Sequence, residues 1–465
     1  ADEPENDRFV RLLDPPFDGR TVLQKRIALR KALLAQPGPR LAKKIAILGG
    51  STTDEVRNVL ELFLLRAGIE PTFYESQFGR YWEEVVFGTP ELDAFAPDVV
   101  YVHTGFRNLR GVPGPGAGEA EVTAALDEQM AHFEELWQTA ERRFGCPVIQ
   151  NNLELPDLQP LGHLDSSAVA GQTRYVLAVN RRISEAAGRH GYLLVNDVFQ
   201  LSARLGLERW HDSRFWHAYR YALAHDCIPE LAHRVARLVG AVFGLSKKCL
   251  VVDLDDTLWG GVIGDVGVEG IEIGGETAEG EAFAALQSYL KALHQRGILL
   301  AACSKNDREN ALAGFGHPDS VLRVEDFAAF EASWEPKPAN LEAIARKLSL
   351  GLDSLVFLDD NPAEREIVRA QLPQVTVPEV GRGPADFPRV LDQAAYFESV
   401  ALSEDDLERN RRYAENRARS EVQGRFATHE DFLASLDMQA EIGPFGPPYL
   451  CLLYTSDAAD DYFWV

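Results

Sequence analysis

The chain has 465 residues, of which 46% are hydrophobic and 25% charged, and its formal net charge is −24. These values are typical of a globular chain of about two to four domains and argue against long disorder. The acidic charge opposes contact with a phosphate backbone, so nucleic acid is not an expected partner. No apolar run approaches the ~20 residues that span a membrane, so a membrane is not expected either.

The first predicted domain covers residues 41–244 and follows an N-terminal extension at 1–40. Short apolar segments predict strands, and the longer amphipathic segments between them predict helices. Such alternation is typical of a parallel sheet covered by helices. The expected strands are 43–49, 70–76, 97–104, 146–152 and 192–198, and the expected helices are 52–68, 120–144, 173–191 and about 216–242.

A second α/β series, the predicted domain at 248–395, begins after the short polar joint at 244–248. Asn361 and Pro362 have the residue types of a helix N-cap and first helical position. The expected fold class is therefore α/β with two parallel-sheet domains. The expected strands are 249–256, 298–307 and 354–361, and the expected helices are 279–297 and 340–350.

The remaining chain has a different character. Residues 396–450 are expected to hold a helical segment over 403–440 and the start of a further region, with a strand beginning at 437–445. Residues 451–465 show no clear period, and we expect them to come from outside the natural gene. The five cysteines are scattered without a CxxC pair, which predicts neither disulfides nor zinc and favours a reducing cytoplasm. The acidic N-terminus is not of the signal-peptide type.

Three apolar segments of the second domain each run into a reactive polar residue: Asp253, Ser304 and Asp359. The C-terminal ends of parallel strands lie side by side, and ligand sites form there. Lys337 lies in a loop just before a helix and can reach the same edge. An acid at a strand end can instead be a simple cap, but four such features in order favour one site.

The residue types at this edge suit phosphoryl transfer. Asp253 can attack phosphorus, and Asp255 can act as general acid and then as general base. Ser304 and Lys337 are candidate phosphate ligands. Mg²⁺ prefers carboxylate oxygens, and the candidate metal ligands are Asp253, Asp255, Asp359 and Asp360.

The segments DLDDTLWGG, CSKND, WEPKPAN and FLDDN resemble, in order, the four motifs of the haloacid dehalogenase superfamily. The DxDxT pattern adds Thr257 as a candidate phosphate ligand. Over about 40–445 the chain more closely resembles FkbH-like proteins, whose phosphatase domain belongs to subfamily IIIC. The resemblance implies a haloacid-dehalogenase-like Rossmannoid domain after an N-terminal domain similar to SGNH hydrolases, which are flavodoxin-like. It also implies that an acetyltransferase-like region starts near the C-terminal end.

The function that this resemblance implies is specific. FkbH-like proteins remove phosphate from 1,3-bisphosphoglycerate and deliver its glyceryl group to the thiol of an acyl carrier protein for polyketide biosynthesis. Two alternatives stay open: a free-standing phosphatase of small phosphate monoesters, and a non-catalytic docking module in a biosynthetic assembly. The intact Asp253 and Asp255 pair argues against the docking module.

In the first domain, Ser51 follows Gly-Gly at a strand end, where an SGNH nucleophile would lie. Gly79 and Asn108 fall where the oxyanion-hole residues of such enzymes are expected. The DxxH motif of these enzymes is not matched, because Asp212 and His217 are spaced DxxxxH. An active acyl-transfer site and a degenerate binding domain therefore both remain open.

A cysteine thiolate could also relay the acyl group. Cys303 is the candidate closest in sequence to the phosphoryl site, since it precedes Ser304. Strand alternation turns its side chain away from its neighbours, and a small buried residue is the plainer interpretation. Direct transfer to the carrier thiol is the third option.

Overall fold

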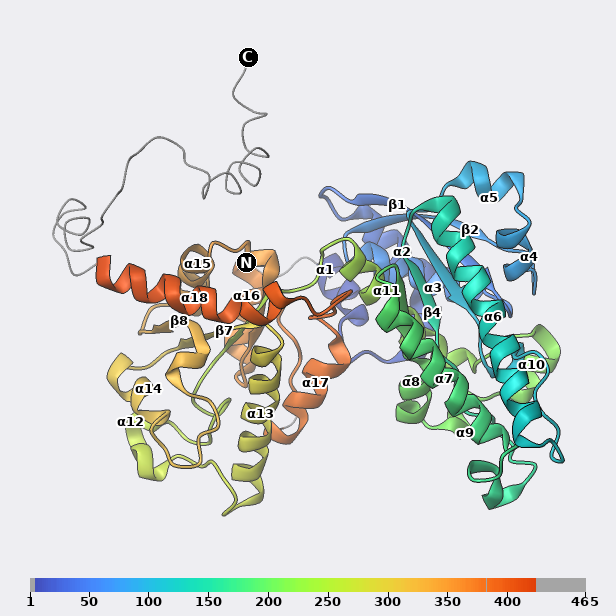
Figure 1. The fold of residues 1–465 in the computed structure, drawn as a ribbon. Coiled ribbons are helices and arrows are strands. Elements are labelled where there is room, and N and C mark those ends of the chain that lie inside the picture. The colour runs from blue at the N-terminus through green and yellow to red at the C-terminus, as the bar shows by residue number, and fades with distance from the viewer. Residues whose placement is uncertain (1–4, 382, 424–465) are drawn as a thin grey trace, which may run out of the picture. The chain divides into compact units, whose positions relative to one another are not determined.

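The computed structural model describes residues 5–381 and 383–423 of the chain. Residues 1–410 form one compact unit, which contains two separate parallel sheets (Figure 1). A second unit comprises 411–465, of which only the end of one helix is described. The expected strand at 437–445, the further region that it begins and the expected foreign tail at 451–465 lie outside the described residues.

The first sheet has five strands in the order β2-β1-β3-β4-β5, and every neighbouring pair is parallel. All five strands expected from the sequence are present, within a few residues of the predicted bounds. The strands are β1 Leu41–Gly49, β2 Ile69–Glu75, β3 Val99–His103, β4 Val148–Asn151 and β5 Leu193–Asn196.

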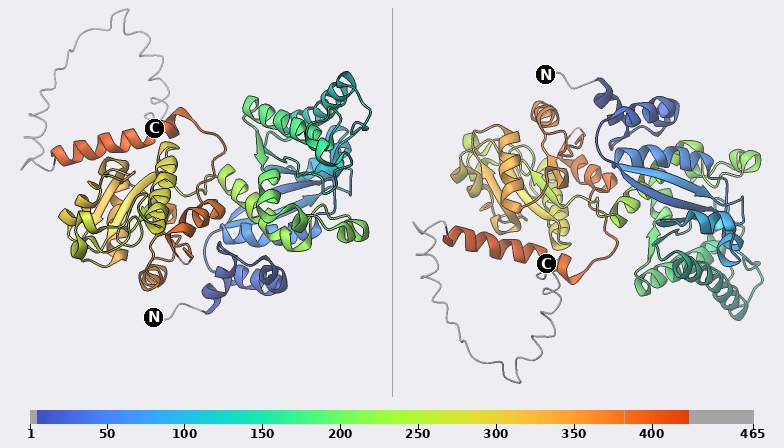
Figure 2. Two further views of the ribbon diagram at one scale, coloured as in Figure 1. Left: turned by 90° about the horizontal axis from the view of Figure 1, so that it is seen from below. Right: turned by 90° about the horizontal axis from the view of Figure 1, so that it is seen from above.

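Helices cover both faces of this sheet, so its central strands are buried (Figures 1 and 2). One face packs against α2, α3 and α11, and the other against α4, α6 and α7. Helix α2 belongs to the segment at 1–40. Its Leu29 and Leu33 join the core on the face that packs against α3 and α11. The helices are α1 Glu5–Val10, α2 Gly19–Ala35, α3 Asp54–Arg66, α4 Tyr81–Val86, α5 Pro90–Phe95, α6 Glu119–Phe144, α7 Gln172–Arg189, α8 Val198–Leu205, α9 Leu207–Trp210, α10 Ser213–Tyr219 and α11 Ile228–Val242.

The prediction of a single helix at about 216–242 is wrong. The chain forms α10, breaks, and begins α11 at Ile228. Arg220 ends α10 in the left-handed conformation at φ 63°, and Pro229 fits the first turn of α11 because that position needs no N–H. The apolar pattern continues across the break because Tyr221 and Leu223 are buried in the same core.

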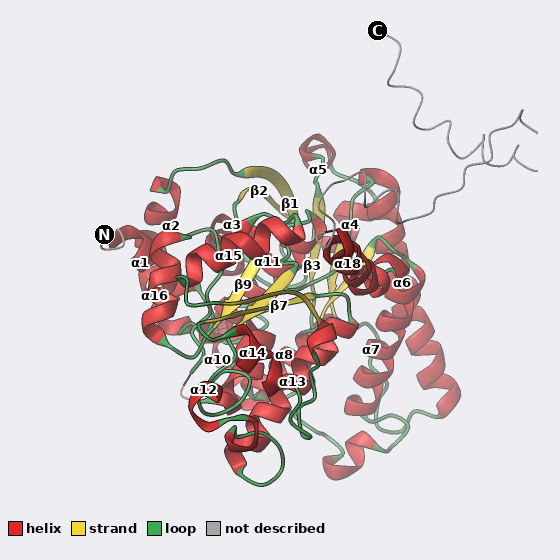
Figure 3. Cartoon of the chain, turned by 90° about the vertical axis from the view of Figure 1, so that its left-hand side faces the viewer, coloured by secondary structure: helices red, strands yellow, loops and turns green. Residues whose placement is uncertain are grey.

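The second sheet has four parallel strands in the order β8-β7-β6-β9. Figure 3 shows β7 and β9 of this sheet in yellow. The three strands expected from the sequence are confirmed, and β8 is an additional edge strand that the sequence did not predict. Asn361 caps α16 as expected, since its side chain accepts from Ala363 N–H. The strands are β6 Cys249–Val252, β7 Leu299–Ser304, β8 Phe327–Ala332 and β9 Leu355–Leu358.

The helices around this sheet enclose a core of their own. Their bounds are α12 Ile263–Val266, α13 Ala278–Gln295, α14 Arg308–Gly314, α15 Lys337–Leu348, α16 Pro362–Gln371 and α17 Phe387–Ala394, and α18 spans Glu404–Gln423. None of the helices in the described residues has the length and apolar character needed to cross a bilayer.

Candidate active site

The candidate phosphoryl-transfer residues gather at the C-terminal edge of the second sheet. Asp253 follows β6, Ser304 ends β7, and Asp359 follows β9. Pairing of β6 with β9 holds Asp253 and Asp359 side by side. Asp253 N–H donates to the Leu358 carbonyl, just before Asp359, at 2.9 Å. Lys337 is the first residue of α15 rather than part of the loop before it.

Lys337 is the buried cation of this edge. Its Nζ lies 2.6 Å from Asp253 Oδ1 and 3.3 Å from Asp359 Oδ2, and it donates to the Cys303 carbonyl at 2.7 Å. Burial alone would lower the pKa of Lys337, but the attraction of Asp253 and Asp359 outweighs it and holds this pKa above its usual range. The lysine therefore stays charged between the two carboxylates.

Asp253 has the surroundings of an ionised nucleophile. Burial raises its pKa to about 6, with Lys337 opposing that rise and Asp359 adding to it. At neutral pH the side chain is therefore mostly a carboxylate, which is the form that attacks phosphorus. Ser304 is 1% exposed at the end of the neighbouring strand, where its carbonyl accepts from Ser333 N–H at 3.1 Å.

Three carboxylates at this edge are placed to hold a cation. Asp253, Asp359 and Asp360 each offer an oxygen, and these oxygens lie within 4.8 Å of one another. Burial is the first cause that raises the pKa of both Asp359 and Asp360, and a bound dication would oppose that cost. An all-carboxylate set with room for water suits Mg²⁺. The fourth expected ligand, Asp255, is not part of this cluster.

Asp255 is instead fixed by three hydrogen bonds that the sequence did not predict. Its Oδ1 accepts from Trp259 Nε1 at 2.9 Å and from Ile263 N–H at 3.1 Å. Its Oδ2 accepts from Asn306 Nδ2 at 2.9 Å. These three donors use both oxygens of the Asp255 carboxylate and fix its orientation. A carboxylate held in this way suits an acid–base group better than a metal ligand.

Asn306 and Trp259 are the functional residues that sequence reasoning missed. Asn306 does not cap the following helix, because the cap residue of α14 is Asp307. Trp259 is fully buried, and its indole N–H donates to Asp255. The sequence did contain a signal for both residues. Trp259 lies four residues after Asp255, and Asn306 lies two residues after Ser304. A buried indole N–H or side-chain amide needs a hydrogen-bond partner, and Asp255 is a nearby acceptor.

Thr257 does not have the free hydroxyl expected of a phosphate ligand. Its Oγ1 donates to Asp360 Oδ1 and accepts from Asp360 N–H, both at 3.1 Å. A hydroxyl has one proton, and here that proton is given to Asp360. Thr257 therefore links the loop after β6 to the loop after β9 by hydrogen bonds. These bonds orient the carboxylate of Asp360, a member of the metal cluster.

The first sheet brings Ser51 and Asn108 close together, and the expected oxyanion residues Asn108 and Gly79 each donate a hydrogen bond within the protein. Asn108 Nδ2 donates to the Gly50 carbonyl at 2.7 Å, and a Cβ on Gly50 would lie 2.5 Å from that nitrogen. Gly79 N–H donates to the Gly49 carbonyl at 3.3 Å. The Gly79 N–H and one of the two Asn108 amide protons are thus used within the protein. Ser51 is 3% exposed, and its Oγ has no hydrogen-bond partner in the described part of the chain.

No acid–base dyad joins Ser51. Asp212 caps α10 by accepting from Phe215 N–H at 2.9 Å, while His217 is exposed on the same helix. Within residues 5–381 and 383–423, the structure therefore does not assemble a Ser-His-Asp triad around Ser51.

Cys303 is not supported as an acyl relay. Its side chain is fully buried, and burial raises the pKa of the thiol to about 12. A buried, protonated thiol is a poor nucleophile, since the thiolate is the reactive form. The plainer interpretation, a small buried residue packed behind Lys337, agrees with the structure.

Comparison with solved structures gives a strong likeness over most of the chain. It is the crystal structure of the N-terminal part of the protein BF1531 from Bacteroides fragilis, described as containing a phosphatase domain complexed with Mg. The two are 28% identical with a TM-score of 0.74, and the match covers 81% of this chain and 99% of that chain. The likeness extends over both sheets, so the two-sheet α/β fold is shared.

Two further matches are weak. A gut microbial diltiazem-metabolizing enzyme is 11% identical with a TM-score of 0.30, covering 47% of this chain and 51% of that chain. A salicylyl-acyltransferase from a tetracycline biosynthetic pathway is 14% identical with a TM-score of 0.25, covering 44% and 56%. Neither supports an argument about function. No protein-family model matches the chain, and no curated protein matches its sequence.

Proposed function

We propose that this protein is a magnesium-dependent phosphatase of the haloacid dehalogenase type, with Asp253 as nucleophile. One observation carries the proposal: the buried ammonium of Lys337 lies between Asp253 and Asp359 at the C-terminal sheet edge. The similarity to the N-terminal part of BF1531, which contains a phosphatase domain complexed with Mg, supports it.

In the proposed reaction, Asp253 attacks the phosphorus of a phosphate monoester, and the bond from phosphorus to the ester oxygen breaks. Asp255 gives its proton to the departing oxygen, and later takes one from the water that releases phosphate from the aspartyl phosphate. Lys337 and Ser304 stabilise the charge on the transferring oxygens. Asp253, Asp359 and Asp360 would hold Mg²⁺, whose charge would offset repulsion between the nucleophile and the anionic substrate.

The test is release of inorganic phosphate from small phosphate monoesters. We expect activity with Mg²⁺, loss of activity in EDTA and its recovery when Mg²⁺ is restored. Asp253→Asn is expected to lower kcat by at least ~10³-fold, because an amide cannot form the aspartyl phosphate. Full activity of Asp253→Asn, or of the metal-free protein, would contradict the assignment. Asp265→Asn, an exposed change on α12, is a control expected to behave like the parent.

The finer proposal is that the phosphatase activity serves glyceryl transfer in the cytoplasm. The phosphomonoester of 1,3-bisphosphoglycerate would be hydrolysed at Asp253. The acyl phosphate would pass its glyceryl group to the thiol of an acyl carrier protein, releasing a second phosphate and forming a thioester for polyketide-type biosynthesis. This proposal is supported by the motif resemblance and by Ser51, whose buried Oγ is unpartnered in the described residues. The four described cysteines are free, which agrees with a reducing compartment.

Intact-protein mass spectrometry of a phosphopantetheinylated carrier protein tests the transfer. With enzyme, Mg²⁺ and 1,3-bisphosphoglycerate generated in place, we expect a glyceryl-sized mass gain that requires Asp253. Ser51→Ala is expected to keep phosphate release and lose the mass gain. If phosphate is released from many small esters without any gain on the carrier, the protein is a free-standing phosphatase. If Asp253→Asn keeps full biological activity, the chain is a docking module.

A further inference from the structure

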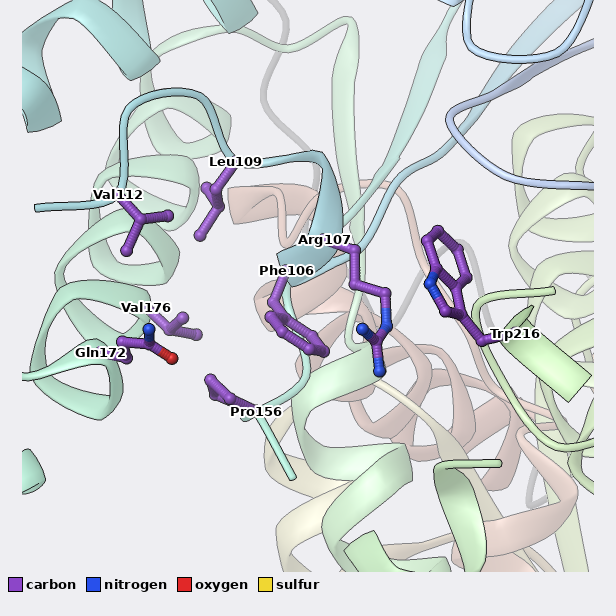
Figure 4. Close-up of a pocket in the computed structure, with 8 residues that line it drawn as sticks. All are labelled: Phe106, Arg107, Leu109, Val112, Pro156, Gln172, Val176 and Trp216. Atoms are coloured by element: carbon purple, nitrogen blue, oxygen red, sulfur yellow. The ribbon is translucent and has the colours of Figure 1, made fainter. Parts of the chain in front are cut away.

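A cavity of about 340 Å³ lies at the C-terminal edge of the first sheet (Figure 4). Its size falls within the range of small-molecule sites, and the C-terminal edge of a parallel sheet is where such sites form. The walls come from the single 3₁₀ turn Phe106–Asn108 after β3, from the start of α7 and from α10. The lining residues are Phe106, Arg107, Leu109, Val112, Pro156, Gln172, Val176 and Trp216.

Arg107 lines this cavity, and a second guanidinium group, that of Arg220, lies against the ring of Trp216, another lining residue. Arg107 lies 4.9 Å from the ring centroid of Phe106 and 4.8 Å from that of Trp216, and Figure 4 shows it between the two rings. Arg220 lies 5.4 Å from the Trp216 centroid. Two cations on one indole repel each other, so an anion between them would be stabilised.

The negative charge near these cations is small. Asp157 is 3.9 Å from Arg107, at the limit of an ion pair, and Arg220 pairs with no carboxylate in the described part of the chain. The other acid that acts on Arg107 is the buried Glu154, whose pKa is raised by burial to about 7 despite Arg107. Glu154 is therefore about half neutral near pH 7, and the pair of arginines keeps a net positive charge.

The cavity also has structural links to Ser51. Asn108, on the same turn as Arg107, donates to the Gly50 carbonyl at 2.7 Å. On the other side, Thr52 N–H donates to the Arg220 carbonyl at 3.0 Å. Arg220 has a positive φ of 63°, an unfavourable conformation for a non-glycine residue and one that recurs at functional sites. Gly50 and Thr52, on either side of Ser51, are thus hydrogen-bonded to the turn that carries Arg107 and to Arg220 itself.

We propose that this cavity binds a small organic anion, a carboxylate or phosphate ester with an apolar body, through Arg107 and Arg220. The apolar lining from Leu109, Val112 and Val176 would take the body, and the guanidinium groups would take the anionic oxygens. The site is separate from the phosphatase residues and does not rest on the assignment of Asp253.

Fluorine NMR of the full chain carrying 5-fluorotryptophan provides a local readout. The Trp216 signal is assigned by its loss in Trp216→Phe, and Asp253→Asn is used as the background so that phosphate esters are not hydrolysed. The probes are benzoate, phenyl phosphate and the neutral benzyl alcohol. We expect a saturable shift of the Trp216 signal with at least one anion and none with benzyl alcohol at the same concentrations. A response to benzoate alone indicates a carboxylate ligand, and one to phenyl phosphate alone a phosphate ester.

Arg107→Gln is expected to weaken anion binding by about tenfold or more, because it removes a charge-assisted hydrogen bond. Arg220→Asn should act in the same direction and keeps a residue that tolerates positive φ, so it serves if Arg107→Gln fails to fold. Arg181→Gln, which removes an exposed arginine of α7, should bind like the background. The proposal is overturned if the Trp216 signal ignores both anions, if benzyl alcohol shifts it equally, or if the folded arginine variants bind like Arg181→Gln.

Discussion

At the scale of residues, the two aspartates of the DxD motif have different surroundings. Asp253 faces the Lys337 ammonium at 2.6 Å, whereas Asp255 accepts from Trp259, Ile263 and Asn306. The first arrangement keeps an anion ready to attack, and the second fixes a carboxylate in one orientation. In the proposed reaction, the difference in partners, rather than residue type, separates the nucleophile from the acid–base group.

The Asn306 hydrogen bond yields a prediction about leaving groups. Asn306→Ala removes the donor to Asp255 Oδ2, so proton delivery to the departing oxygen should worsen. We expect kcat to fall about 10- to 100-fold for alkyl phosphates and little for 2,4-dinitrophenyl phosphate, whose leaving group needs no proton. Steady-state kinetics over a series of esters measures this. An equal loss for every ester would assign Asn306 a purely structural role, and Asn310→Ala on α14 is the matched control.

Glu154 yields a prediction about pH and stability. Burial raises its pKa from 4.5 to about 7, so between these values the folded protein keeps a proton that the unfolded chain loses. The contribution to stability is therefore complete below pH ~4.5 and is lost as pH rises through ~7. This difference corresponds to at most ~3 kcal/mol.

Denaturant unfolding across this pH window measures the effect. Glu154→Gln should flatten the fall in the free energy of unfolding between pH ~4.5 and ~7, since an amide does not titrate there. Glu121→Gln, an exposed change on α6, should keep the slope of the parent. An unchanged slope in Glu154→Gln would show that this carboxyl is not the source.

At the scale of elements, helix ends show where residue choice and backbone geometry disagree. Helix α15 ends at Ser349 with φ 53°, and α6 ends at Gly145 with φ 60°. A left-handed cap is unfavourable for a residue with a Cβ and free of that cost for glycine. The two caps therefore form a natural pair for comparison.

We expect Ser349→Gly to raise the free energy of unfolding by about 0.5–1 kcal/mol, and Gly145→Ala to lower it by a similar amount. Ser349 is exposed, and a Cβ on Gly145 would meet no atom within 4 Å, so packing should contribute little to either change. Denaturant unfolding measures both, with phosphatase activity as a check on the site. Changes of the same sign would show that cap conformation does not govern these sites.

The strands β7 and β8 show why one segment was predicted from the sequence and its neighbour was not. Residues 299–304 are all buried and form β7 as expected. Residues 327–332, FAAFEA, are only partly buried and form β8 by pairing with β7 alone. Alanine and glutamate favour helices, so their local preference gave no strand signal, and the neighbouring strand decided the outcome.

At the scale of the whole molecule, the net charge of −24 has a consequence for stability. An excess of like charge repels itself in the compact state and is relieved on unfolding. Raising monovalent salt from ~0.01 M to ~0.15 M shortens the Debye length from ~30 Å to ~8 Å. We therefore expect Tm to rise by a few degrees over this range, measured by calorimetry in EDTA. A fall in Tm would mean that screened attractive pairs outweigh the net repulsion.

The sequence by itself determined the α/β class, eight of the nine described strands and the residues of the phosphoryl-transfer edge. It could do so because Asp253, Ser304 and Asp359 each stand at the end of an apolar strand, and parallel strands bring such ends together. Only the tertiary structure decided which carboxylates cluster as a metal site, that Thr257 is tied to Asp360, and that Asn306 orients Asp255. Those roles depend on side-chain directions and on hydrogen-bond partners up to about a hundred residues away, which no local pattern encodes.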